Sequence, residues 1–187
     1  MSYRHEIRLS GSGGQGLILM GKVLAEAAAI YEDRNATQSQ SYGPEARGGA
    51  SKSEVIISDG DIDYPKATHL DLLLAFTQEA CDKYAPDLKA GGVLVVDAQF
   101  VRKLPERGGP LVALPMHEIA TRSVGRTLMA NIVALGVIVA SSSVVSREAV
   151  ESAIRARVPR GTEELNLQAF RAGIDAVRAS QASSASA

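Results

Sequence analysis

Cysteine is almost absent from this 187-residue chain, which has one, Cys81. A single cysteine excludes an internal disulfide, and it also excludes an iron–sulfur cluster held by this chain alone, because such clusters need about four thiolates. The three histidines, His5, His69 and His117, are far apart and show no pair spacing typical of a metal site. We therefore expect no metal site in this chain, so any redox centre must lie elsewhere.

The chain also lacks a strong net charge and a long uninterrupted apolar run. Its formal net charge is −1, so no global field attracts nucleic acid or an anionic membrane, and an anionic ligand must be met by a few local arginines. The richest apolar run, residues 127–145, is interrupted by Asn131 and Gly136, whereas a spanning helix needs about 20 mostly apolar residues. We therefore expect a core helix there. For the chain as a whole, we expect neither nucleic acid nor a membrane as a partner. The charged start "MSYRHEIRL" does not resemble a secretory signal, which makes a cytoplasmic location the default expectation.

The composition, 45% hydrophobic and 22% charged, is typical of one soluble globular domain, predicted over residues 1–179. Residues 180–187, "SQASSASA", are too small and polar to pack and are predicted to be disordered. Apolar periodicity predicts strands near residues 4–9, 35–39, 51–58, 69–76, 93–98 and 111–115, and helices near 17–31, 78–89, 126–141, 146–157 and 162–179. This alternation favours an open three-layer α/β fold, Rossmann-like, with a mostly parallel sheet and a glycine-rich first strand–helix turn.

That first turn has the sequence "GSGGQG" and consists of Gly11, Ser12, Gly13, Gly14, Gln15 and Gly16, here called the glycine corner. Glycine lets a ligand approach backbone N–H groups with no Cβ in the way. These donors lie at the amino end of a helix, where the dipole favours negative charge, so phosphate is the expected ligand. The alternative is a tight strand–helix turn that only allows close packing.

A nicotinamide or flavin site would also need an acidic residue about 20 positions further on, at the end of the second strand. Glu32 and Asp33 have this separation but precede the expected strand, and the strand's exit, "TQSQSYG", contains no acid. A stand-alone NAD(P)-dependent or other nucleotide-dependent enzyme stays an alternative, although it would require catalytic groups beside the glycine corner. The sequence offers only the adjacent pair His117 and Glu118, so we assign no catalytic residue.

A second loop, "QSYGPEARGGAS" at residues 40–51, contains Arg47 with Gly48 beside it. Arginine is a permanent cation whose forked donors suit phosphate. In an open α/β sheet, loops at the carboxyl ends of neighbouring strands meet at one crevice, so this loop and the glycine corner can share one anion. Alternatively, Arg47 pairs with Glu45 on the surface.

Together, "GSGGQG", "SYGPEARGGAS" and "LMANIVALG" (residues 128–136) resemble the gamma subunit of the 2-oxoacid:acceptor oxidoreductases, over about His5 to Ile174. The resemblance implies a subunit that is inactive alone and is partnered by alpha and beta subunits, with a further delta subunit, ferredoxin-like or NAD-reducing, in some complexes. Thiamine diphosphate, magnesium and [4Fe–4S] clusters then belong to the partner subunits. Electrons pass to ferredoxin or NAD, and the gamma subunit helps to bind coenzyme A over the active site.

Carried over by motif, the resemblance implies that residues 11–16 donate to the diphosphate of coenzyme A, with Gln15 adding its amide. It implies that Arg47 meets a phosphate, such as the 3′-phosphate, and that Asn131 faces the pantetheine or thiol end. Asn131 can instead be a buried amide that satisfies neighbouring backbone, and Arg122 and Arg126 are further cations or helix-end charges. The favoured 2-oxo acid is 2-oxoglutarate, followed by phenylglyoxylate and pyruvate. A purely structural assembly subunit is the remaining alternative.

Overall fold

The computed structural model describes residues 3–42 and 50–185, and its centre is a six-stranded sheet of order β2-β3-β1-β4-β5-β6. Strands β1, β4, β5 and β6 run parallel, while β3 lies antiparallel between β1 and β2. The mostly parallel sheet confirms the predicted fold class. The strands are β1 Arg4–Ser12, β2 Asn35–Tyr42, β3 Ala50–Ser58, β4 Leu70–Ala75, β5 Leu88–Asp97 and β6 Leu111–Leu114.

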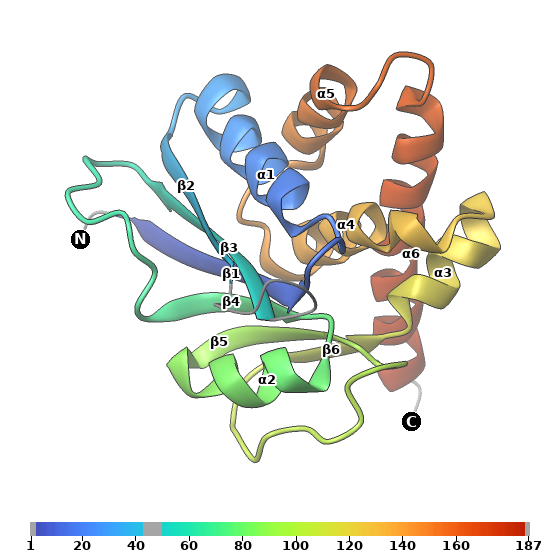
Figure 1. Ribbon diagram of the computed structural model, residues 1–187, viewed down its shortest axis with the longest axis horizontal. Helices are drawn as coiled ribbons and strands as arrows, with labels where there is room; N and C mark the ends of the chain where they lie inside the picture. The colour runs from blue at the N-terminus through green and yellow to red at the C-terminus, as the bar shows by residue number, and fades with distance from the viewer. Residues whose placement is uncertain (1–2, 43–49, 186–187) are drawn as a thin grey trace.

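Helices cover both faces of the sheet, but unequally (Figure 1). Most of them contribute to one large core, which includes Leu9, Leu74 and Val95 from the sheet. Among the helices of the described segments, α2 alone packs on the opposite face, with Ala80 and Cys81 in a smaller core. The helices are α1 Leu17–Tyr31, α2 Gln78–Tyr84, α3 Met116–Val124, α4 Ala130–Ser142, α5 Arg147–Arg157 and α6 Glu163–Ala185.

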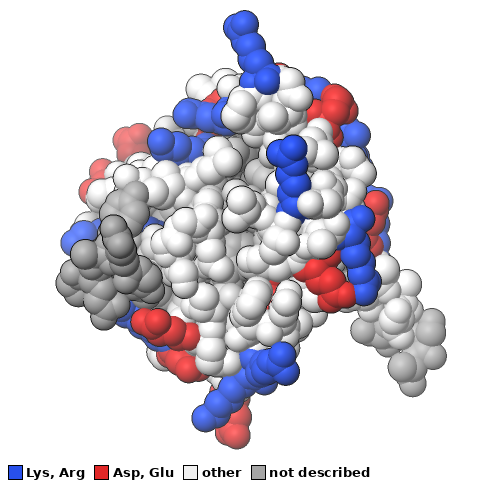
Figure 2. Space-filling view, turned by 45° about the vertical axis from the view of Figure 1, so that its right-hand side comes forward, with Lys and Arg blue, Asp and Glu red and all other residues white. Residues whose placement is uncertain are grey.

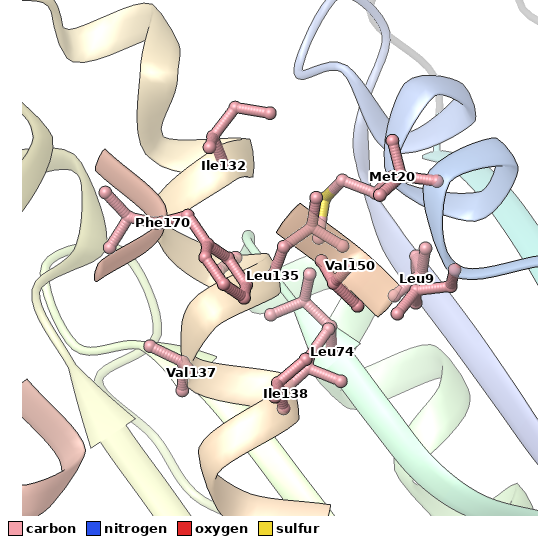
Figure 3. Packing of buried hydrophobic residues seen from close by; sticks show 14 of the residues in the cluster. Leu9, Met20, Leu74, Ile132, Leu135, Val137, Ile138, Val150 and Phe170 are labelled. Carbon is pink, nitrogen blue, oxygen red and sulfur yellow. The ribbon is translucent and has the colours of Figure 1, made fainter. Parts of the chain in front are cut away.

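Helix α4 lies in the middle of the larger core, and its residues 130–139 are all buried. Figure 3 shows Leu135 and Ile138 of α4 among side chains of the sheet, of α1 and of α6. Helix α6 comes so close that a Cβ atom at Gly136 would lie 2.0 Å from the carbonyl oxygen of Phe170. This packing agrees with the expected core helix, and over the residues described no helix is long and apolar enough to cross a membrane.

Two helices differ from their sequence predictions. The helix predicted over 78–89 ends at Tyr84 and is followed by a 3₁₀ turn, Ala85–Asp87, because Pro86 has no N–H to continue an α-helical ladder. Helix α3 was not predicted, since it buries only Met116 and Ala120 and so carries little apolar periodicity.

The carboxyl end of α6 also differs from the prediction of a helix ending near Ala179 and a disordered segment 180–187. The helix continues to Ala185, and its residues 180–183 are exposed. Alanine has the highest helix propensity, and extending an existing helix adds one hydrogen bond for each residue fixed. These turns are therefore held by local bonding, such as that from Ser183 Oγ to the carbonyl of Ala179 at 3.0 Å.

The amino end of the sheet is held by a buried carboxylate, Glu6 of β1. Its oxygens accept hydrogen bonds from the backbone N–H groups of Thr68 and His69 at 2.7 and 3.0 Å, and from Nε of Arg4 at 2.9 Å. Burial raises the pKa of Glu6, but the His69 N–H, Arg4 and the Thr68 N–H together outweigh it and lower that pKa below its ordinary value. Glu6 therefore stabilises the fold in its charged form.

Candidate functional site

The parallel strands end at one edge of the sheet, and the loops that follow them form the candidate site. Ser10 of β1 pairs with Ala75 of β4, Ala75 pairs with Val96 of β5, and Asp97 pairs with Leu114 of β6. Figure 1 shows the glycine corner leaving this edge at the start of α1. Ligands of open α/β sheets bind in the crevice outside such strand ends.

The glycine corner presents backbone donors to solvent. Gly16 is the N-cap of α1, and among the described residues no side chain caps the helix, so none of these side chains satisfies the first-turn N–H groups. Gly14 and Gly16 have φ angles of 88° and 74°, which glycine adopts without strain. Beside these groups lies a cavity of about 270 Å³, lined by Ser12, Gly14, Gln15, Gly16, Leu17, Ile18 and Ser51. The corner can therefore receive an anion at a helix amino terminus.

Gln15 stabilises the turn itself. Its Oε1 accepts a hydrogen bond from the N–H of Ser12 at 2.7 Å, and a Cβ atom at Gly11 would lie only 2.2 Å from that oxygen. The Ser12 N–H is therefore already used within the corner. The amide nitrogen of Gln15 is the part of this side chain left to meet a ligand.

Asn131, on the first turn of α4, lies against the same corner. A Cβ atom at Gly16 would be 2.3 Å from its Nδ2 atom. The residue is 7% exposed, and within the described part of the chain its side chain has no hydrogen-bond partner. The structure thus brings Asn131 and the glycine corner together, and a glycine at position 16 is needed to fit the amide.

The segment with Arg47 and Gly48 lies outside the described residues. Its flanking strands place its two ends, however, because Tyr42 pairs with Ser51 and Ala50 pairs with Ser12 of the glycine corner. Ala50, which follows this segment, is therefore directly beside that corner, whereas Tyr42, which precedes it, is one strand further out.

The other two candidate arginines lie at the carboxyl end of α3 and just after it. Arg122 pairs with Glu118 one helical turn before it and is largely exposed, and Arg126 is exposed. The pair of Arg122 with Glu118 agrees with the reading of Arg122 as a helix-end charge.

The acidic pair after α1 lies at the wrong end of that helix for a dinucleotide site. Glu32 follows the 15-residue helix and accepts a hydrogen bond from the N–H of Ser146. Because a helix rises about 1.5 Å per residue, Glu32 is roughly 20 Å from the glycine corner. Strand β2 itself contains no acid. The geometry therefore agrees with the sequence argument against a nicotinamide or flavin fingerprint.

A buried Asp–His pair at the same edge was missed by the sequence reasoning. Asp97, 0% exposed, ends β5, and its Oδ2 lies 2.7 Å from Nδ1 of His117, at the start of α3. Asp97 lies near the carboxyl end of the predicted strand 93–98 and His117 lies just after the predicted strand 111–115, so the parallel topology was the signal that could have paired them. They are 20 residues apart in sequence, and only the sheet brings them together.

The described residues contain no group of three or more His, Cys, Asp or Glu side chains that could hold a metal ion. Cys81 is buried, and burial, together with the nearby Asp82 charge, raises the pKa of its thiol. A single buried cysteine does not offer the about four thiolates that an iron–sulfur cluster needs.

A glycine-rich strand–helix turn at the carboxyl edge of a mostly parallel sheet places this chain in the broad class of Rossmann-like α/β folds. Within that class, the chain belongs to the pyruvate ferredoxin/flavodoxin oxidoreductase family, whose model matches residues 6–176. This confirms the family that the three motifs resemble.

Individual relatives match almost end to end. A 2-oxoglutarate synthase subunit KorC from Methanocaldococcus jannaschii is 50% identical, with 94% of this chain and 95% of that protein covered. The solved gamma subunit of a keto/oxoacid ferredoxin oxidoreductase from Geobacter sulfurreducens is 57% identical, with a TM-score of 0.86 and coverages of 92% and 95%. The pyruvate oxidoreductase subunit PORC from Thermotoga maritima is 25% identical, with a TM-score of 0.77 and coverages of 92% and 96%.

Proposed function

We propose that this chain is the gamma subunit of a 2-oxoglutarate:acceptor oxidoreductase and that its glycine corner holds the diphosphate of coenzyme A. The name of the 50% identical relative favours 2-oxoglutarate over pyruvate or phenylglyoxylate. Oxidative decarboxylation takes place on thiamine diphosphate between alpha and beta subunits, and clusters in the partner subunits carry electrons to ferredoxin or NAD. The chain has one cysteine and cannot supply such clusters itself.

The observation that carries the proposal is the uncapped amino terminus of α1 beside the cavity at the glycine corner. Backbone donors at such a terminus favour a phosphate over a neutral ligand. Arg47 and Gly48 complete the site from the loop that leaves beside Ser12, and Asn131 turns its amide toward the rest of the ligand. With the nucleotide end held, the thiol meets the acyl group at an effective molarity that can reach roughly 10⁵ M.

The test replaces Arg47 with Ala in the assembled complex. Losing a charge-assisted bond to phosphate costs about 1.5–3 kcal/mol, so we expect the KM for coenzyme A to rise roughly 10- to 100-fold. Reduction of the clusters by 2-oxoglutarate before coenzyme A is added should stay unchanged. Arg122→Ala is the matched control, because Arg122 is an exposed cation already paired with Glu118.

An unchanged KM in the Arg47 variant would contradict the proposal and favour a purely structural assembly subunit. Turnover of NAD(P) by the chain alone would favour the stand-alone enzyme instead. Direct titration of coenzyme A into the isolated chain and into the complex separates two cases. Weak binding by both indicates a weak site, whereas tight binding by the complex alone indicates a site completed by a partner subunit.

A further inference from the structure

The Asp97–His117 pair is held in one orientation by its hydrogen bonds. Oδ2 of Asp97 accepts from the backbone N–H of His117 at 3.0 Å and lies 2.7 Å from Nδ1, while Oδ1 accepts from the N–H of Gln99 at 2.9 Å. Carboxylate oxygens accept and do not donate, so Nδ1 carries the proton in this pair. In the neutral ring, Nε2 then has a free lone pair.

The His117 ring has two aromatic neighbours and is partly exposed. The ring contacts Phe76 and Phe100 edge to face, with centroids 5.4 and 4.9 Å away, and 15% of the His117 side chain is exposed. Among the residues that the structure describes, Nε2 has no hydrogen-bond partner. Asp97 is fully buried, and its two carboxylate oxygens already have the hydrogen-bond partners given above.

The pair lies close to the glycine corner but is separate from it. A Cβ atom at Gly11 would be 3.0 Å from Cβ of Phe76, whose ring in turn contacts His117. Asp97 is two strands from β1, which is about 10 Å along the sheet edge at the usual strand spacing. This is further than a diphosphate held at the corner extends, and it is within reach of a pantetheine arm. Phe76 is fully buried, but Phe100 is 46% exposed, and its ring suits a chain of methylenes and a thiol better than a phosphate, which prefers cations and N–H donors.

We propose that His117, oriented by Asp97, accepts the proton of the coenzyme A thiol, a role that rests on the proposed function. The S–H bond breaks, its proton passes to Nε2, and the sulfur keeps the electron pair as the nucleophilic thiolate. The carboxylate of Asp97 stabilises the imidazolium, which later returns the proton to water. Figure 2 shows the face of the molecule that includes this edge, with few charged side chains at its centre, as expected for a thiol site rather than a second phosphate site.

The test compares His117→Gln with the wild-type complex. General base catalysis contributes about 10²- to 10⁴-fold, so acyl transfer to coenzyme A should fall at least 100-fold. Binding of coenzyme A and of its desulfo analogue should each stay within twofold. Alkylation of the thiol of bound coenzyme A should also slow, which is a readout independent of turnover. His69→Gln is the matched control, because His69 is exposed at the opposite edge of the sheet.

A second variant guards against loss of folding. His117→Ala leaves a space between the two phenylalanines, and added imidazole should restore part of the acyl transfer rate. Equal weakening of coenzyme A and desulfo-coenzyme A binding by His117→Gln would overturn the proposal, because the ring would then hold the body of the ligand. Unchanged transfer and alkylation would overturn it too. If Arg47→Ala raises the KM for coenzyme A in the same complex, the proposed function stands whether or not the role of His117 is confirmed. If the wild-type complex binds no coenzyme A, the proposed function itself is wrong.

Discussion

Alanine substitutions along the glycine corner separate backbone strain from steric contact. Among the residues that the structure describes, a Cβ atom at Gly13 meets nothing within 4 Å. A Cβ atom at Gly14 also meets none of them, but the backbone there has a φ of 88°. At Gly16 both effects act, since φ is 74° and the Cβ atom would lie 2.3 Å from Nδ2 of Asn131. A left-handed conformation costs a non-glycine residue about 1–2 kcal/mol, and overpacking costs about 1–3 kcal/mol.

We therefore expect Gly13→Ala to change the free energy of unfolding by less than about 0.5 kcal/mol, because surface changes of this kind are small. Gly14→Ala should cost about 1–2 kcal/mol and Gly16→Ala about 2–5 kcal/mol. Urea unfolding measures each value, and Tm should fall by roughly 2–4 °C per kcal/mol for a chain of this length.

Asn131→Ala in the Gly16→Ala background provides the decisive comparison. Removing the amide relieves the contact and leaves only the backbone term, so the double-mutant cycle should give a coupling of about 1–3 kcal/mol. Additivity to within about 0.5 kcal/mol would refute the reasoning, since it would mean that Asn131 and Gly16 do not share space. Equal costs at Gly14 and Gly16 would refute it as well.

Three other predictions concern the rest of the fold. Gly136→Ala should destabilise by about 3 kcal/mol in urea unfolding, because its Cβ would lie 2.0 Å from a backbone carbonyl of α6, while Gly91→Ala, with nothing within 4 Å, is the near-neutral control. The pKa of Glu6 is lowered in the folded state, so the stability that its charged form adds is complete above its ordinary pKa and is lost as the pH falls through the lower folded value. When unfolding is followed from about pH 7 to about pH 3, the free energy of unfolding of Glu6→Gln should therefore fall less steeply than that of wild type. Cys81 should react with a thiol reagent only as fast as the protein opens, since it is buried and its thiol pKa is raised, and rapid native-state reaction would contradict this.

The sequence predicted the elements with strong patterns and missed those whose pattern is weak. Helix α1 has the predicted bounds, Leu17–Tyr31, because its buried residues repeat with helical spacing. Helix α3 was missed because only two of its residues are buried. The end of α6 differs from the prediction because a composition of small and polar residues is typical of disorder, although alanine continues a helix without any tertiary contact.

The candidate site was accessible from sequence only where its residues are contiguous. The glycine corner is one hexapeptide, and its chemistry follows from backbone geometry that glycine permits. The contact of Asn131 with Gly16 and the pair of Asp97 with His117 depend on which strands and helices are neighbours. No local pattern encodes that order, because β1 pairs with β3 on one side and with β4 on the other.

The two ends of the crevice differ in a way that matches the two ends of an acyl carrier. At β1 the available groups are backbone N–H donors of a helix amino terminus, which stabilise negative charge without a side chain. At β5 the available group is a ring nitrogen between two phenylalanines, which can exchange a proton in apolar surroundings. A ligand with only a phosphate would leave the second end unused, and one with only a thiol would leave the first. A molecule with a diphosphate and a thiol at opposite ends of a flexible arm uses both, so the charge distribution along this edge itself favours coenzyme A over a simple nucleotide.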